Sequence, residues 1–360
     1  MKRIISLIIV SLVIVTEQAW ANPISKEQAR RNVEAFLKER GKSVAIQQPS
    51  GVRHKQSPKP EKEALYIFNL GNKEGYVVAS GDDCAPAVLG YSTTGEYDAE
   101  KAPENMKAWL EEYKNQIEFM QRNGIVSVRE ASTDYPAIKP LLTTKWDQGD
   151  PYNISCPDFF DTGSKCVTGC VATAMAQILY FHRKNSVNET QMQLPGYPCR
   201  TYWTDQGGYV KVEPIFSGSP IDWDNMLDSY NGSETDAQKK AVADLMAYCG
   251  SSVNMDYGRY ESGAKDADVP SALKRIFSYS ENTTLIYRKN YTNDSEWDKL
   301  IYNQLKRGMP VYYSGGDNSS NKGHAFVCDG YNDGFFHINW GWSGNPDNYY
   351  RLTVLNPQTQ

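Results

Sequence analysis

The spacing of apolar residues near the N-terminus predicts two amphipathic helices. Residues 25–41 place apolar side chains at helical intervals, begin with Ser25 and Gln28 in the pattern of a capping box, and end at a glycine. Residues 103–124 repeat the helical pattern and end at Gly124. The apolar face of this second helix is predicted to consist of Met106, Trp109, Leu110, Tyr113, Ile117 and Met120.

Between the two helices, the pattern changes to that of three short strands. Residues 64–80 contain two apolar runs separated by a tight turn at 72–75, and residues 85–93 form a third run. Residues 125–140 lose this periodicity and gain Ser, Asp and Pro, so we place a domain boundary there. A small α+β unit is therefore expected before the boundary and a larger unit after it.

The larger unit has the pattern of helices first and strands afterwards. An alanine-rich, almost wholly apolar helix is predicted from Cys170, with further helices at 236–250 and 295–308, the last with Ser295 as its N-cap. Four runs of aromatic and β-branched residues follow, at 310–316, 324–331, 335–340 and 349–355. This order is typical of an α+β domain with an antiparallel sheet.

The first residues have the pattern of an export signal. Lys2 and Arg3 precede the apolar stretch 4–15, and Ala19-Trp20-Ala21 forms a cleavage site of the A-x-A type. The apolar stretch is too short to cross a bilayer, which takes about 20 residues, and no other segment is apolar enough to span one. We expect residues 1–21 to be a signal peptide, and the product to be secreted or otherwise extracytoplasmic, including attachment at the cell surface.

Composition and charge narrow the classes of function. A formal charge of −5 without a basic patch argues against nucleic acid or an anionic membrane as the main partner. The seven cysteines are an odd number and form no paired CxxC units, so a zinc site is not expected and at least one thiol stays free. Cys156 and Cys166 flank a loop, and the sequence does not decide whether they form a disulfide or remain two reduced thiols. No metal or organic cofactor is expected.

Cys170 is the strongest candidate for a nucleophile. It follows Gly169 at the start of the alanine-rich helix, where unpaired N–H groups and the positive end of the helix dipole favour a thiolate. Gly169 lets a substrate backbone approach the sulfur, and the Cys170 N–H can donate to an oxyanion. The alternative is a buried structural cysteine, which is the commoner case for a cysteine taken alone.

The sequence contains only four histidines, which limits the choice of a general base. His324 follows a run of small polar residues that ends at Gly323, and it opens an apolar strand, so it is placed to contact a ligand beside a loop. His54 lies in a polar linker, His182 suits the end of a helix as a cation, and His337 alternates within a strand as a satisfied sheet histidine would. We therefore expect His324 to be the base, with Gly323 on the approach of the substrate.

Four motifs in one order resemble a known family. WDQGDPYN (146–153), TGCVATAMAQILYFH (168–182), GHAFVCDGYNDGFFHINWGWSG (323–344) and YYRLTVLNP (349–357) are together similar to the streptopain family, secreted bacterial cysteine peptidases with a papain-like fold. Residues 75–98 also resemble the propeptide of that family. The resemblance implies a papain-like catalytic domain, with a helical part and an antiparallel sheet part, after a smaller α+β prodomain.

The resemblance also implies roles for individual residues. Cys170 matches the nucleophile, His324 matches the general base and acid, and the Gln148 side chain completes an oxyanion hole with the Cys170 N–H. Residues at the end of the third motif are implied to orient the histidine or to wall the site; these are Asn339, Trp340 and Trp342.

The implied activity is that of a secreted cysteine endopeptidase made as a self-inhibited zymogen. Proteins and peptides would be its substrates, and hydrolysis would pass through an acyl-enzyme. Residues 22–130 would be an inhibitory prodomain, removed between Arg122 and Tyr135, and residues 131–360 the catalytic domain. The family continues after residue 357 with a glycine-rich loop and a last strand, which leaves open whether this sequence is a fragment. Two alternatives also stay open: a transglutaminase-like acyltransferase on the same fold, and a non-catalytic secreted binding or adhesion protein.

Overall fold

The computed structural model describes residues 22–43, 45–47, 63–125, 135–159, 163–184, 194–291, 294–317, 322–344 and 347–352. The predicted signal peptide, and most of the segment in which we expect the maturation cleavage, lie outside these residues. No helix among the described residues is both long and apolar enough to span a membrane.

The N-terminal unit, by which we mean residues 22 to about 130, contains the predicted elements in the predicted order. They are α1 (Lys26–Glu39), β1 (Leu65–Asn69), β2 (Tyr76–Ser80), β3 (Val88–Tyr91) and α2 (Glu104–Asn123). The Gln28 N–H donates to the Ser25 side chain, but the Gln28 side chain contacts Asn32, so only half of the predicted capping box forms. Gly124 ends α2 with a positive φ of 61°.

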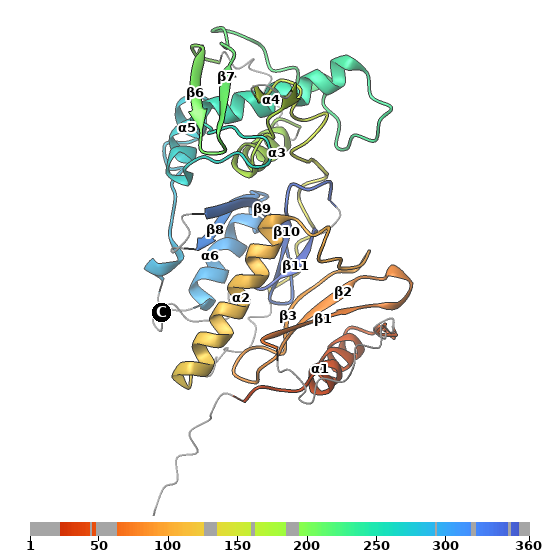
Figure 1. The fold of residues 1–360 in the computed structure, drawn as a ribbon. Coiled ribbons are helices and arrows are strands. Elements are labelled where there is room, and N and C mark those ends of the chain that lie inside the picture. The colour runs from red at the N-terminus through yellow and green to blue at the C-terminus, as the bar shows by residue number, and fades with distance from the viewer. Residues whose placement is uncertain are drawn as a thin grey trace, which may run out of the picture.

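The first half of the larger unit is mainly helical (Figure 1). It contains α3 (Cys170–Lys184), α4 (Asp236–Ser252) and the short α5 (Val269–Arg275). A small four-stranded sheet, which the sequence did not predict, has the order β5-β4-β7-β6 and consists of β4 (Asp158–Phe159), β5 (Ser164–Lys165), β6 (Arg200–Thr204) and β7 (Gly208–Val212). Single turns of 3-10 helix occur in both units, at Gly71–Lys73, Trp223–Asn225, Asp266–Asp268 and Arg288–Asn290.

The helix α6 (Asp294–Lys306) begins before Ser295, so the prediction that Ser295 is its N-cap is wrong.

A second, seven-stranded antiparallel sheet contains strands of both units. Its order is β1-β2-β3-β11-β10-β9-β8, with β8 (Val311–Asp317), β9 (Lys322–Asn332), β10 (Phe335–Asn339) and β11 (Asn348–Tyr350). β11 joins the two units, because Tyr349 pairs with Tyr91 and Tyr350 with Gly90. A Cβ on Gly90 would lie 2.4 Å from the Tyr350 ring, so only glycine fits there. The predicted boundary therefore divides the chain but not the sheet.

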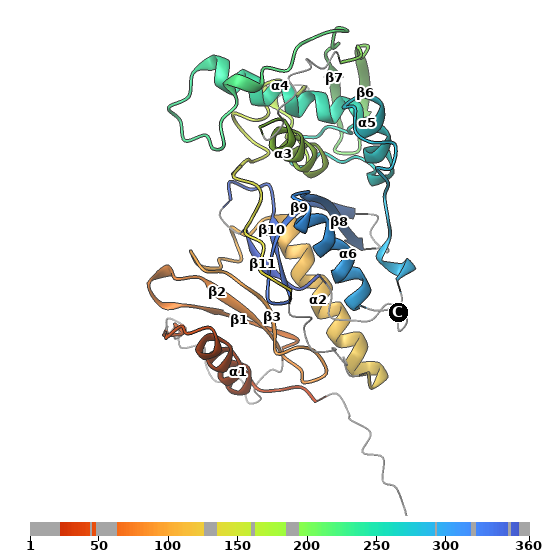
Figure 2. The same ribbon diagram turned by 180° about the vertical axis from the view of Figure 1, so that it is seen from behind.

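Helices cover both faces of this sheet (Figures 1 and 2). On one face, α2 and α6 share a core with alternate residues of the strands, including Phe326 and Cys328 of β9. On the other face, α3 packs against Ala325 and Val327 of the same strand. α1 covers β1–β3 in a third cluster that includes Phe335 of β10. The start of α3 is thereby brought to the start of β9.

Candidate active site

Cys170 is the first residue of α3, as the sequence predicted, and it lies against β9. The Ala325 N–H donates a hydrogen bond to Cys170 Sγ with a nitrogen–sulfur distance of 3.3 Å. Ala325 directly follows His324, which is half-buried in β9 and pairs with Gly315 of β8. The fold thus brings the candidate nucleophile to the strand position next to the candidate base.

Gly169 precedes Cys170 in a conformation that requires glycine. Its φ is +84°, and an added Cβ would lie 2.7 Å from the Ser262 carbonyl oxygen and 3.0 Å from the Met255 side chain. The glycine is therefore required by the packing of this chain itself, and not only by the approach of a substrate.

Gln148 lies beside the start of the same helix. Its carbonyl oxygen accepts a hydrogen bond from the Thr168 N–H at 3.1 Å, which holds the loop two residues before Cys170. The Gln148 side chain is half-buried. Asp147 next to it accepts a hydrogen bond from the Ser343 hydroxyl at 2.5 Å. This contact ties the Gln148 loop to the loop that follows Trp340.

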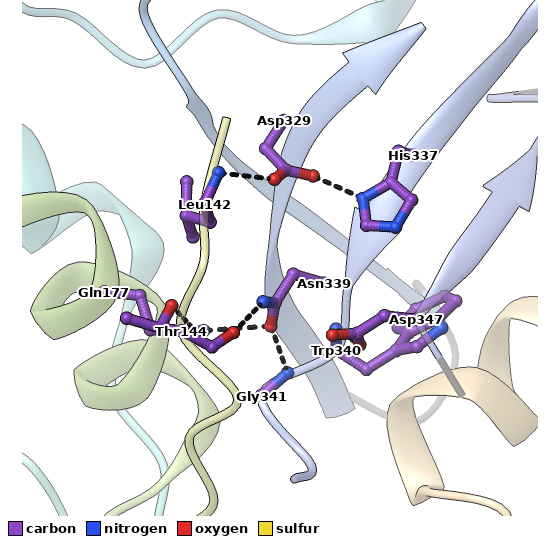
Figure 3. A network of polar contacts seen from close by, with 9 residues as sticks. All are labelled: Leu142, Thr144, Gln177, Asp329, His337, Asn339, Trp340, Gly341 and Asp347. Carbon is purple, nitrogen blue, oxygen red and sulfur yellow. Dashed lines mark hydrogen bonds and ion pairs between the residues drawn. The ribbon is translucent and has the colours of Figure 1, made fainter. Parts of the chain in front are cut away.

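Asn339 is buried in a network that joins β10, α3 and the segment 135–148 (Figure 3). Its Nδ2 donates to the Thr144 carbonyl at 2.9 Å, and its Oδ1 accepts from Gln177 Nε2 at 3.1 Å and from the Gly341 N–H at 3.0 Å. The Thr144 hydroxyl completes the ring by donating to Gln177 Oε1 at 2.6 Å. Sequence reasoning missed Gln177, although its position two helical turns after Cys170 puts both on one face of α3.

Trp340 is buried on the opposite face of the sheet, where the N-terminal unit covers it. Its ring packs edge-on against Trp109 of α2, with ring centroids 5.9 Å apart, and in a tilted arrangement against Phe326 at 4.9 Å. The Asn105 side chain, also from α2, donates to the Trp340 carbonyl at 2.8 Å. Trp342 is partly buried against the same core. The N-terminal unit therefore contacts a predicted site residue directly.

The electrostatic environment of Cys170 differs from the sequence prediction. Burial raises the pKa of the Cys170 thiol, and the charge of Asp266 adds to this, while the Ala325 N–H and the amides at the helix start lower it. Burial outweighs the other effects, so the pKa of the thiol is raised, opposite to the direction that the sequence predicted.

Most of the other cysteines are buried, and His54 lies outside the described residues. All seven cysteines are free thiols, and burial raises the pKa of Cys156 to about 12 and that of Cys166 to about 11. Burial lowers the pKa of His182, contrary to the expectation of a helix-end cation. His337 forms an ion pair with Asp329, with 2.6 Å between Nδ1 and Oδ1. The described residues contain no group of three or more His, Cys, Asp or Glu arranged to hold a metal ion.

Most of the chain is similar to known proteins. The model of the Peptidase C10 family matches residues 146–350, and that of the Spi protease inhibitor matches residues 21–117. Streptopain from Streptococcus pyogenes is 34% identical over an alignment of 391 residues, gaps included. The alignment covers 99% of this chain and 94% of streptopain. The thiol protease/hemagglutinin PrtT of Porphyromonas gingivalis is 31% identical over 355 residues, which cover 94% of this chain and 39% of PrtT.

Two solved structures from Prevotella intermedia are also similar. A fragment of prointerpain A, carrying a cysteine-to-alanine mutation, is 31% identical with a TM-score of 0.69, covering 88% of this chain and 94% of the fragment. Active wild-type interpain A is 36% identical with a TM-score of 0.53, covering 62% of this chain and 89% of interpain A. The expected α+β fold, with a prodomain before a papain-like catalytic domain, is confirmed by this likeness. The chain therefore belongs to the Peptidase C10 (streptopain) family, and it is a cysteine protease in zymogen form that acts on protein substrates.

Proposed function

We propose that Cys170 is the nucleophile of this protease and His324 its general base and acid. The observation that carries the proposal is the hydrogen bond from the Ala325 N–H to Cys170 Sγ, since it sets the sulfur beside the residue that follows His324. The contact of Thr168 with Gln148 supports an oxyanion hole formed by the Gln148 side chain and the Cys170 N–H. Gly169 and Gly323 then flank the approach of the substrate.

The reaction follows from these positions. The Cys170 thiolate attacks a peptide carbonyl, and Gln148 and the Cys170 N–H stabilise the oxyanion. His324 protonates the leaving amine and then takes a proton from the water that hydrolyses the acyl-enzyme. Asn339 ties the helix of Cys170 to the segment that leads to Gln148, through Gln177 and Thr144, while Trp340 and Trp342 lie in the core under α2 and support the strand from behind.

The N-terminal unit acts in this proposal as an intramolecular inhibitor. Its helix α2 covers Trp340 through Trp109 and Asn105, and in this zymogen form burial raises the pKa of Cys170. Cleavage between Arg122 and Tyr135 releases the catalytic domain, residues 131–360, and lets the thiol ionise. Residues 1–21 are removed on export, so that both events take place outside the cytoplasm.

Incubation under reducing conditions tests these roles. The wild-type chain should shorten by the length of the N-terminal unit and then hydrolyse a fluorogenic peptide, whereas Cys170→Ala should do neither. Cys199→Ala is the matched control, because Cys199 is exposed and lies outside the proposed site, and it should behave as the wild type. Trimming and hydrolysis by purified Cys170→Ala would contradict the proposal. Incorporation of an amine in place of water would favour the acyltransferase alternative.

A further inference from the structure

A partly buried histidine outside the proposed catalytic pair is hydrogen-bonded to one carboxylate and is affected by the charge of a second. His337 Nδ1 lies 2.6 Å from Oδ1 of Asp329, whose side chain is fully buried. Asp329 occupies a β-bulge of β9, because His337 pairs with Gly330 whereas Ile338 pairs with Cys328. A bulge re-aims the side chain of the extra residue, which here directs the carboxylate to the imidazole. The second carboxylate, Asp347, acts on the same ring through its charge.

Each carboxylate also holds a backbone N–H group of a segment that carries a proposed site residue (Figure 3). Asp329 Oδ2 accepts from the Leu142 N–H at 2.9 Å, and Leu142 starts the stretch that runs through Thr144 to Gln148. Asp347 Oδ1 accepts from the Trp340 N–H at 2.8 Å. The oxyanion loop and the tryptophan loop are therefore each held by a hydrogen bond to an aspartate side chain.

The charge balance of this cluster depends on His337. Burial acts to lower the pKa of His337, but the Asp329 carboxylate with its hydrogen bond, and the charge of Asp347, raise it overall. Burial raises the pKa of Asp347 to about 7, although the charge of His337 lowers it. Lys145 also lowers the pKa of Asp347, and the Tyr349 ring lies against His337 with centroids 5.1 Å apart. A buried carboxylate that loses its cation is left uncompensated, which disfavours the conformation that buries it.

We propose that His337 is a positioning residue for the protease, which holds the segments of Gln148 and Trp340 in register through Asp329 and Asp347. This inference rests on the proposed roles of Gln148 and Trp340. His337 touches neither the substrate nor the reacting atoms, so its loss should affect turnover more than substrate binding.

Amide hydrogen exchange tests the inference without requiring activity. In full-length protein with Cys170→Ala, His337→Gln should speed exchange at least tenfold in peptides covering 135–148 and 335–344, and by less than twofold in α4. His182→Gln, a histidine substitution at the far end of α3, should leave both peptides unchanged. Unchanged exchange in either peptide, or equally faster exchange in α4, would overturn the inference.

Kinetics of the matured enzyme supply the second readout. Relative to wild type, His337→Gln should lower kcat per titrated active-site thiol at least tenfold, with KM within twofold. Unchanged kcat per thiol would overturn the inference, because a purely structural role lowers only the fraction of active molecules. If His337→Gln does not fold, the same exchange and kinetic measurements are made on Asp347→Asn, with the same expected results. This variant keeps an oxygen that can accept from the Trp340 N–H. Failure of the wild type to hydrolyse peptides would refute the proposed function, while hydrogen exchange would still decide this inference.

Discussion

Truncation of Trp109 should loosen the N-terminal unit from the catalytic site. Trp109 lies in α2 and packs edge-on against Trp340, Phe326 and Tyr313, with ring centroids 5.3–6.1 Å apart. A Trp→Ala substitution in a core lowers the free energy of unfolding by about 3–5 kcal/mol. For Trp109, which is only partly buried, we expect a loss of about 2–3 kcal/mol in the free energy of docking. Since each 1.4 kcal/mol is a factor of ten, docking should weaken roughly 30- to 150-fold.

A conservative variant of the same residue provides the control. The indole N–H of Trp109 is buried without a hydrogen-bond partner among the described residues. Trp109→Phe keeps an aromatic ring and removes this unpaired donor, which is itself a cost in the wild type. We therefore expect Trp109→Phe to dock about as well as the wild type.

Brief alkylation with iodoacetamide, read by mass spectrometry before trimming begins, measures the docking. Cys170 should be labelled faster in Trp109→Ala than in the wild type or Trp109→Phe, while the exposed Cys199 serves as the internal reference. Labelling of Cys170 at the wild-type rate in a Trp109→Ala protein that is measurably less stable would refute the reasoning, because the lost contacts would then have no influence on access to the sulfur.

Three further predictions follow from the site. Gln148→Ala should lower kcat of the matured enzyme by roughly 10²–10³, as loss of an oxyanion donor does; a change of less than about threefold would remove Gln148 from the site. Asn339→Ala removes three buried hydrogen bonds, each worth about 1 kcal/mol, and should lower the free energy of unfolding by about 3 kcal/mol in urea titration. An unfolding free energy within about 0.5 kcal/mol of wild type would contradict that network. The His337 cation stabilises the fold fully below about pH 6.5 and is lost as the pH rises through its raised pKa. The difference in Tm between wild type and His337→Gln should therefore shrink as the pH rises, and a difference that grows would have the wrong sign.

Local periodicity was sufficient to predict the helices and the hairpin of the N-terminal unit. The apolar face of α2 is the one that the sequence indicated, because Met106, Leu110, Tyr113, Ile117 and Met120 are all buried and Trp109 packs beside them. The start of α3 at Cys170 was also predictable, since an apolar run follows a glycine there.

Features that depend on distant segments were not predictable. The pairing of β3 with β11 joins residues far apart in the sequence, and strand periodicity does not specify a partner. The Asp329 carboxylate reaches His337 only because a bulge interrupts the alternation of β9. The pKa of Cys170 was predicted in the wrong direction, because desolvation depends on the surrounding tertiary structure and not on the position of the residue in its helix.

Removal of the N-terminal unit is expected to change the ionisation of the Cys170 thiol. The direct measurement is the rate of Cys170 alkylation as a function of pH, before trimming and after it. We expect a midpoint above the ordinary thiol range before trimming, and one below about pH 7 afterwards, when the sulfur pairs with the His324 imidazolium. The same midpoint in both forms would contradict this expectation.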